Sequence, residues 1–214
     1  MQRWESVAFV HWRYPAEQLR ARLPRGLGLQ TFDGSAWVGL TPFVLAGLRL
    51  PGLPAVPGWS SFAETNLRTY VTDGEHDGLW FLRVHCARRL VVAGFRGGLG
   101  LPYGYVPGSV SARTGATTYR MRRTEVAVEA GPRIEPDSLI DSLMGRWSAF
   151  TWHLGQLWRV PVEHEPWPLH GARLLTLRTD IAQRAGLPDP VGDPMVHYSP
   201  GVGVRIGAPH RAGR

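Results

Sequence analysis

Apolar residues along this chain alternate with polar ones or run together in short blocks, and this pattern predicts β-strands more often than helices. The predicted strands are rich in β-branched and aromatic residues and are bounded by Gly, Pro or Asp. They cover residues 35–45, 64–71, 79–86, 90–95, 117–128, 156–163, 172–178 and 195–204.

Helical periodicity is confined to a few segments. Pro15 precedes the first, Asp137 is positioned to cap the second, and Gly186 ends the third. These segments are residues 16–23, 138–152 and 180–185.

About three helices against eight or more strands predict a single β-rich α+β domain over residues 1–214. Strands this numerous, with few helical crossovers between them, pair mainly antiparallel and curl to hide their edges. We therefore expect a curved antiparallel sheet or barrel around a pocket. Residues 50–59, which hold three prolines and two glycines, are expected to shape the rim of that pocket.

Composition excludes several classes of protein. With 43% hydrophobic and 19% charged residues the chain is not disordered, and no apolar run approaches the ~20 residues needed to span a bilayer. Residues 1–15 lack the pattern of a signal peptide, and the single cysteine, Cys86, agrees with a reducing compartment. We expect a cytoplasmic protein with no membrane partner.

All 24 basic residues are arginines, because the sequence contains no lysine. This excludes a Schiff base on a lysine, a phosphate-binding lysine of the P-loop kind and an ammonium general base. Arginine does not replace lysine in these roles because it stays protonated.

The net charge of +7 is unevenly placed. No acidic residue occurs between Asp77 and Glu125, and this stretch fits a polyanion-binding face, an anion-lined small-molecule pocket or solvated strand faces. Its arginines are Arg83, Arg88, Arg89, Arg96, Arg113, Arg120, Arg122 and Arg123.

The segment over residues 62–71 carries the most informative polar pattern. In a strand, period-two geometry places a carboxylate, an amide, a guanidinium and a phenol on one face: Glu64, Asn66, Arg68 and Tyr70. This row is either a solvated face of an antiparallel sheet or the lining of a pocket, where it could orient a carboxylate or carbonyl ligand.

Six glycines and two prolines fall within residues 94–108. The run has no lysine, so a phosphate-binding loop is disfavoured. We expect a turn that brings Arg96 and Tyr103 near the strand of Glu64.

Several motifs together resemble the YqjF-like family of unknown function, and the resemblance spans the chain from end to end. The motifs are HWR at 11–13, LP at 23–24, FDGSAWV at 32–38, FAETNLRTYV at 62–71, LPY at 101–103, HEPWPL at 164–169 and HYSPGV at 197–202. That family is distantly similar to acetoacetate decarboxylase, so the resemblance implies a β-rich cone or barrel around a small hydrophobic pocket.

The similarity to acetoacetate decarboxylase also implies roles for particular residues. It sets Glu64 on a pocket glutamate and Arg96 on the family's arginine. It sets Tyr103 on the Schiff-base lysine and Gly104 on the lysine that lowers the pKa of the first. Because both lysine positions have changed, the decarboxylase mechanism cannot operate in this chain.

These observations lead to a set of candidate residues. Glu64, Tyr103 and Arg96 are the candidate catalytic residues. The candidates for substrate binding are Arg68, Tyr70, Asn66, His11 and Trp12. No cofactor is expected, and no metal either, because two prolines between His164 and His170 prevent the helical spacing that would place both imidazoles on one face.

Two functions of the same pocket follow. The first is a small-molecule enzyme of the acetoacetate-decarboxylase-like superfamily that works without the lysine, using acid/base chemistry such as dehydration, cyclisation or isomerisation on a carbonyl or carboxylate compound. The alternative is a small-molecule binding protein without catalysis. We expect a small-molecule ligand rather than nucleic acid, and homo-oligomerisation is left open.

Overall fold

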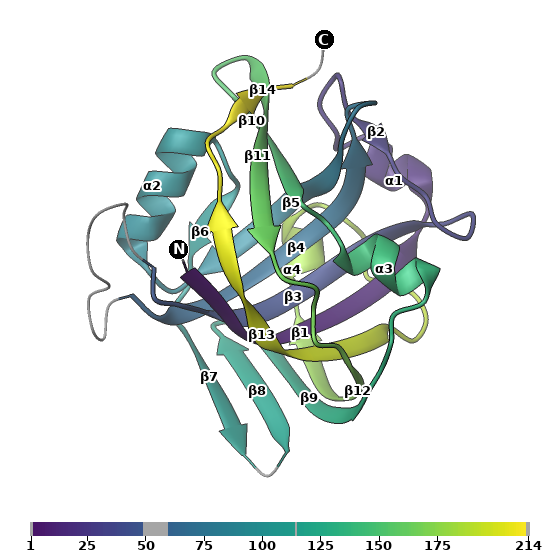
Figure 1. The fold of residues 1–214 in the computed structure, drawn as a ribbon, viewed down its shortest axis with the longest axis vertical. Coiled ribbons are helices and arrows are strands. Elements are labelled where there is room, and N and C mark those ends of the chain that lie inside the picture. Colours follow the sequence, from purple (N-terminus) through teal and green to yellow (C-terminus); the bar gives the residue numbers. More distant parts are fainter. Residues whose placement is uncertain (1, 49–59, 114, 213–214) are drawn as a thin grey trace.

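The computed structural model describes residues 2–48, 60–113 and 115–212. Within these residues the chain forms 14 strands and four short helices (Figure 1). The helices are α1 (Ala16–Arg20), α2 (Arg89–Leu99), α3 (Ser138–Met144) and α4 (Ile181–Arg184). The strands are β1 (Gln2–Tyr14), β2 (Gly28–Leu29), β3 (Ala36–Ala46), β4 (Phe62–Thr72), β5 (Asp77–Cys86), β6 (Tyr103–Tyr105), β7 (Gly108–Arg113), β8 (Ala116–Met121), β9 (Thr124–Arg133), β10 (Ser148–His153), β11 (Gln156–His164), β12 (His170–Thr179), β13 (Met195–Ile206) and β14 (His210–Arg211).

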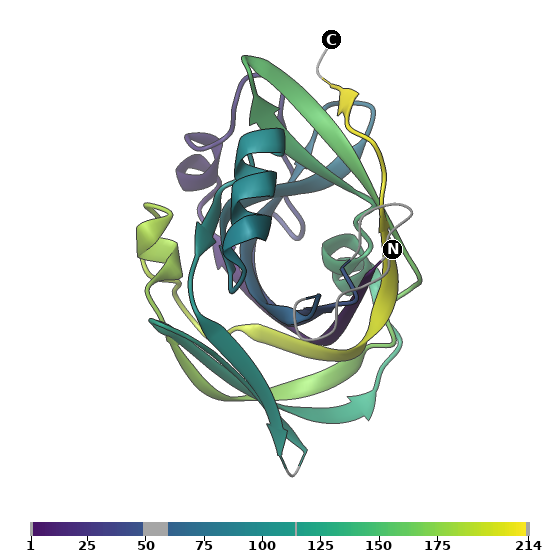
Figure 2. The ribbon, with the colours of Figure 1, turned by 90° about the vertical axis from the view of Figure 1, so that its left-hand side faces the viewer.

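The strands form one strongly curved sheet, in the order β14-β11-β10-β5-β4-β3-β1-β13-β12-β9-β8-β7. Among the described strands, β5 pairs in parallel with β10 and with β6, and the other pairs are antiparallel. β11 also pairs with β13 over three residue pairs, so the sheet bends round on itself (Figure 2). The prediction of a curved, mainly antiparallel sheet is confirmed, although the sheet is not a closed barrel because β12, β9, β8 and β7 continue beyond the meeting point.

The central strands bury both of their faces. On one face an outer core gathers side chains of β1, β3 and β4 against β8, β9 and α4; it includes Val10, Trp12, Leu40, Leu67, Tyr119, Val126 and Ile181. On the other face an inner core joins β1 and β3 to α2 and α3; it includes Phe9, Phe43, Leu45, Val91, Ile140 and Met144. β4 therefore lies between two packed layers, and Phe62–Val71 are all buried.

The structure corrects the prediction for residues 90–108. Residues 90–95 are not a strand, and the glycine-rich run does not begin as a turn, because Arg89–Leu99 form helix α2. Val91, Phe95 and Leu99 recur at a spacing of four residues, which places them on one side of a helix. β-branched valines and three interior glycines mask this period. The helix ends at Gly100, whose φ of 66° is left-handed and whose N–H bonds back to Arg96.

Other boundaries also differ from the predictions. The helix expected over 138–152 ends at Met144, and strand β10 begins at Ser148, although Asp137 does cap the helix by accepting a 2.8 Å hydrogen bond from the N–H of Ile140. The strand expected over 117–128 is a hairpin of β8 and β9. The sequence pattern did not reveal strands β1, β2, β6, β7 and β14, and the expected rim over residues 50–59 lies outside the described residues.

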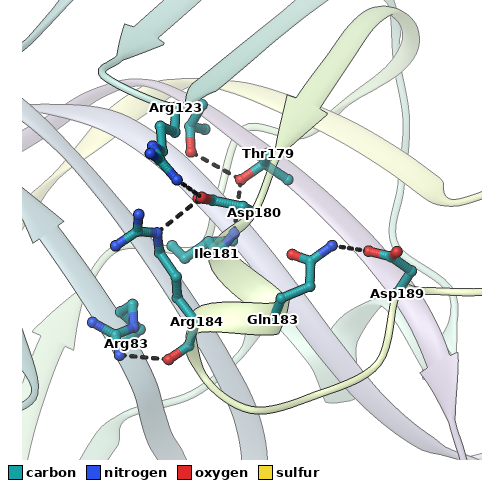
Figure 3. A network of polar contacts seen from close by, with 9 residues as sticks. Arg83, Arg123, Thr179, Asp180, Ile181, Gln183, Arg184 and Asp189 are labelled. Atoms are coloured by element: carbon teal, nitrogen blue, oxygen red, sulfur yellow. Dashed lines mark hydrogen bonds and ion pairs between the residues drawn. The ribbon is translucent and has the colours of Figure 1, made fainter.

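Arginines from the basic stretch hold α4 against the sheet (Figure 3). The carboxylate of Asp180, just before α4, accepts hydrogen bonds from Arg184 at 2.9 Å and from Arg123 at 3.3 Å. Arg83 of β5 donates to the carbonyl of Arg184 at 2.5 Å. These arginines therefore make structural contacts at the surface. None of the described helices is long and apolar enough to cross a membrane.

Two glycines of α2 offer a matched test of this corrected assignment. Gly98 lies inside the helix with open space where a Cβ would stand, so Gly98→Ala should stabilise the protein by roughly 0.5–1 kcal/mol. Gly100 has a left-handed backbone conformation, and a Cβ on it would lie 2.7 Å from the carbonyl oxygen of Trp152. Gly100→Ala should therefore destabilise the protein by about 1–2 kcal/mol or more. Urea unfolding measures both changes, and two changes of the same sign would contradict a helix that ends at Gly100.

Candidate functional site

A cavity of about 60 Å³ lies against the inner face of β4 and β5, next to α2, β10 and β11. This volume holds roughly four water molecules, so it suits a molecule of a few heavy atoms. Apolar side chains form most of the wall. The lining side chains that carry nitrogen or oxygen atoms are Gln2, Trp4, Glu64, Asn66, Arg68, Tyr103, Arg146, His164 and Trp167.

Alternate residues of β4 supply a polar row in the cavity. Glu64, Asn66 and Arg68 point inward, and their residues are only 3%, 4% and 5% exposed. The period-two prediction for these three residues therefore places them on the face that lines a pocket rather than on a solvated face. The outward residues between them, Thr65 and Leu67, are equally buried on the other side of the sheet.

Glu64 is held by Tyr103, which follows α2 on strand β6. The Tyr103 hydroxyl donates to Oε1 of Glu64 at 3.2 Å. Burial raises the pKa of the Glu64 carboxyl to about 8, while the side chains of Tyr103 and Cys86 lower it by less. At neutral pH Glu64 is therefore mostly a neutral acid. Because Oε1 accepts from Tyr103, Oε2, which has no partner among the described residues, is the oxygen free to carry this proton.

Tyr103 itself is a poor acid in this setting. Burial, followed by the Glu64 charge, raises the pKa of its phenol well above the ordinary value. Phe95 stacks on its ring with centroids 5.0 Å apart, which fixes the ring beside α2. Cys86 contacts the same carboxyl, and burial raises the pKa of its thiol to about 12, so it is not a thiolate nucleophile.

Arg68 and Arg146 bring two guanidinium groups to the cavity. Arg146, just beyond α3, forms an ion pair with Asp77 at 3.2 Å. Among the described residues, Arg68 has no acidic partner within 4.0 Å; its guanidinium carbon lies 5.6 Å from the ring centroid of Phe9. Since Glu64 is mostly neutral, the cavity carries about one unbalanced positive charge at neutral pH.

Several buried polar atoms of the lining have no hydrogen-bond partner among the described residues. They are Trp4 Nε1, Glu64 Oε2, Asn66 Oδ1, Arg68 Nε and Arg146 Nε. A buried polar atom left unpaired costs about 1–3 kcal/mol, and such groups rarely gather without a reason. Donors and acceptors that converge on one small cavity indicate a polar ligand.

The other sequence-predicted residues lie elsewhere. Tyr70 and His11 are fully buried behind the lining, where they bond to each other at 2.7 Å between Oη and Nε2. Trp12 points to the opposite face of β1 and packs in the outer core, because successive strand residues alternate in direction. Arg96 lies on the exposed side of α2 and does not line the cavity, so the expected turn that would bring it to Glu64 does not form.

The structure adds lining residues that sequence reasoning missed. Arg146 was hidden inside the helix expected over 138–152. His164 was considered only as a metal ligand, and its ring instead stacks on Trp147 with centroids 4.6 Å apart and contacts Trp167 at 5.0 Å. Within the described part of the chain, no three His, Cys, Asp or Glu side chains gather as a metal site would require. Trp4 gave no sequence signal beyond its residue type.

Comparison with known proteins identifies relatives along the whole chain. The model of the DUF2071 family, described as an uncharacterized conserved protein, matches residues 1–203. The uncharacterized protein YqjF of Bacillus subtilis (strain 168) is 34% identical over 208 residues, covering 92% of this chain and 86% of that protein. The resemblance that the sequence motifs indicated is confirmed.

Solved structures share the fold. The enduracididine biosynthesis enzyme MppR, complexed with the condensation product of pyruvate and imidazole 4-carboxaldehyde, has a TM-score of 0.71 at 13% identity, covering 98% of this chain and 88% of that one. Its complex with pyruvate has a TM-score of 0.68 at 12% identity, covering 98% and 89%. An acetoacetate-decarboxylase-like enzyme from Sphingomonas wittichii RW1 has a TM-score of 0.68 at 17% identity, covering 99% and 92%. The fold is therefore acetoacetate-decarboxylase-like.

Burial of Glu64 predicts a specific dependence of stability on pH. Its pKa rises from 4.5 to about 8 on folding, so between these values the folded state keeps a proton that the unfolded state loses. The free energy of unfolding should therefore fall as the pH rises through this window, by on the order of 5 kcal/mol, and level off above it.

Urea unfolding of the wild type and Glu64→Gln between about pH 5 and pH 9 isolates this contribution. The stability of the wild type relative to Glu64→Gln should fall with rising pH. Glu17→Gln changes an exposed residue of α1 and is the matched control. Its free energy of unfolding should depend on pH as that of the wild type does. Parallel profiles for the wild type and Glu64→Gln would show that Glu64 does not hold its proton.

Proposed function

The chain belongs to the DUF2071 family, and from this premise we propose that it is an enzyme of the acetoacetate-decarboxylase-like superfamily acting on a small carbonyl or carboxylate compound. The reaction is acid/base chemistry without a Schiff base, in the class of dehydration, cyclisation or isomerisation. The observation that carries the proposal is the buried row of Glu64, Asn66 and Arg68, which aims an acid, an amide and an unpaired cation into one cavity.

Arg68 supports binding of an anionic ligand. A buried guanidinium stays charged, and without an acidic neighbour it is stabilised best by an anion that enters the cavity. A carboxylate fits its planar array of N–H donors and accepts two parallel hydrogen bonds. The paired Arg146 adds donors without adding unbalanced charge, so a ligand with one negative charge balances the cavity.

Glu64 supports proton transfer. As a neutral acid its Oε2–H can donate to a ligand carbonyl oxygen, and as a carboxylate it can accept a proton from the adjacent carbon. A pKa of about 8 keeps both forms accessible near neutral pH, which is the condition for efficient general acid and base catalysis. Charge that develops on an enolate oxygen would be stabilised by Arg68.

Tyr103 acts on Glu64 rather than on the ligand in this scheme. Its hydroxyl proton already bonds to Oε1, so Tyr103 orients the carboxyl group and stabilises its carboxylate form. No lysine exists in the sequence to form an imine, so polarisation of a carbonyl depends on hydrogen bonds and on the charge of Arg68. This supports enolisation-type chemistry rather than imine-dependent decarboxylation.

Pyruvate is a suitable first probe because MppR, which shares the fold, has been solved in complex with it. It carries one carboxylate and one carbonyl within six heavy atoms. The wild type should bind pyruvate, and Arg68→Met should weaken the affinity at least tenfold, since about 1.5–3 kcal/mol of charge-assisted hydrogen bonding is lost. Isothermal titration calorimetry measures both dissociation constants.

Arg122→Met is the matched control for that measurement. Arg122 is exposed in the turn between β8 and β9, so its loss should not change the affinity. Equal affinities of the wild type and Arg68→Met for pyruvate would show that Arg68 does not bind this ligand.

Proton transfer can be observed directly as exchange of the pyruvate methyl protons with deuterium oxide. The wild type should accelerate this exchange, with a rate that rises with pH up to about 8 as Glu64 loses its proton. Glu64→Gln should slow the catalysed exchange by about 100-fold or more, while Glu17→Gln should match the wild type. Proton NMR of the methyl signal follows the reaction.

The same experiment separates the enzyme from the alternative, a small-molecule binding protein. Binding of pyruvate without accelerated exchange would favour the binding protein. Exchange that continues at the wild-type rate in Glu64→Gln would overturn the role of Glu64.

A further inference from the structure

We propose that Tyr70 and His11 form a buried positioning pair that fixes the orientation of Arg68 in the cavity. This proposal deepens the proposed function and rests on it for the role of Arg68. Neither residue lines the cavity, so neither is a catalytic residue. They act through the arginine.

The hydrogen-bonding chemistry sets a direction for the chain of contacts. Arg68 and Tyr70 lie two residues apart on the same face of β4, and Arg68 lowers the pKa of the Tyr70 phenol through its charge and a side-chain contact. Because a guanidinium has only donors, it can meet the phenol at its oxygen only by donating to it. The phenol proton is then free to point to Nε2 of His11, 2.7 Å away. His11 therefore accepts at Nε2 and carries its own proton on Nδ1.

His11 is kept in the neutral form that this arrangement needs. It is completely buried, and this burial, together with the charges of Arg68 and His197, lowers its pKa well below the ordinary value. A neutral imidazole has one acceptor nitrogen, which is the nitrogen that meets Tyr70. Phe9 stacks on the imidazole with ring centroids 6.4 Å apart, so the ring is held in place.

The register of the sheet brings these groups together. His11 on β1 pairs with Gly39 on β3, and Gly39 pairs with Arg68 on β4. A Cβ at position 39 would lie 2.9 Å from the His11 ring and 3.1 Å from the Tyr70 hydroxyl. The glycine thus leaves the space in which the hydroxyl of Tyr70 reaches across to His11.

Tyr70 also contacts the second arginine of the cavity. The guanidinium of Arg146 lies 5.6 Å from the centre of the Tyr70 ring and 5.2 Å from that of Phe32. Phe32 in turn packs edge-on against Tyr70. Tyr70 therefore meets Arg68 through its oxygen and Arg146 through its ring, which makes it the common support of both cations.

Removal of the Tyr70 hydroxyl should release Arg68 while the aromatic packing stays in place. In Tyr70→Phe, the affinity for pyruvate should weaken about tenfold, the effect of losing one hydrogen bond to a charged group. His11→Phe should give the same loss, and the double variant should lose no more than either single variant because the pair acts as a unit. His11→Gln, whose side-chain oxygen can accept from the phenol, should restore affinity toward the wild-type value.

Tyr119→Phe is the matched control. Tyr119 is another buried tyrosine, and its hydroxyl donates to the carbonyl of Ser6 at 2.5 Å, but it packs in the outer core on the far side of the sheet. Its loss should leave the affinity for pyruvate unchanged. Urea unfolding of all variants shows which of them fold.

Nitrogen NMR of the ligand-free protein tests the same proposal independently of any ligand. The wild type should show His11 protonated on Nδ1 and a slowly exchanging Arg68 side chain. Tyr70→Phe should shift the His11 nitrogens and broaden the Arg68 signal, and Tyr119→Phe should do neither.

The pyruvate titrations and the nitrogen spectra together distinguish failure of this proposal from failure of the proposed function. If the wild type does not bind pyruvate, the proposed function fails with this probe, and the nitrogen spectra decide the positioning role. An Arg68 signal that is unchanged in Tyr70→Phe overturns the positioning pair. A loss of pyruvate affinity of about 100-fold in the double variant also overturns it, because two residues that act independently would each contribute their own tenfold loss.

Discussion

Burial of both faces of β4 is the constraint on which the cavity depends. The outward side chains of this strand are buried, and Leu67 among them packs in the outer core, so the strand cannot rotate or slip without moving that core. Its inward side chains, Glu64, Asn66 and Arg68, are thereby held away from water in fixed positions. Desolvation then acts differently on the two ionisable groups: it keeps the carboxyl protonated and leaves the guanidinium charged, since arginine does not release its proton.

Helices α2 and α3 complete the cavity from segments distant in sequence. α2 ends at the left-handed Gly100, and the chain then returns along β5 so that Tyr103 pairs beside Val84 and reaches Glu64. α3 ends at Met144, and two residues later Arg146 turns inward to meet Asp77. A side chain placed just beyond a helix end has its direction set by how the chain leaves the helix. The caps of these helices therefore determine the electrostatics of the cavity as directly as the residues of β4 do.

The parts of the site that the sequence predicted are those governed by local geometry. Alternation along β4 places Glu64, Asn66 and Arg68 on one face, and this follows from strand geometry alone. The same rule places His11 and Trp12 on opposite faces of β1, so both could not line one pocket. Arg96 lies in the last turn of α2 and Arg146 lies two residues beyond the end of α3, and nothing in the local sequence shows that the first faces solvent and the second the cavity. The role of Tyr70 as a support of Arg68 likewise depends on Gly39 lying across the sheet, which no single segment reveals.

The resemblance to acetoacetate decarboxylase sets Tyr103 on the Schiff-base lysine of that enzyme, and a tyrosine in that place would change what the proposed site can do by more than the loss of a nucleophile. A lysine in this place would bring a second cation to Glu64 and favour its carboxylate form, whereas Tyr103 offers Glu64 only a hydrogen bond, which lowers the carboxyl pKa by less than burial raises it. The acid is therefore neutral at the pH where a lysine-paired glutamate would be charged. In the proposed chemistry, a tyrosine at position 103 accounts both for the absence of an imine-forming amine and for the neutral form of Glu64 as a proton donor. Developing negative charge would then be stabilised by Arg68, which has no acidic partner within 4.0 Å among the described residues.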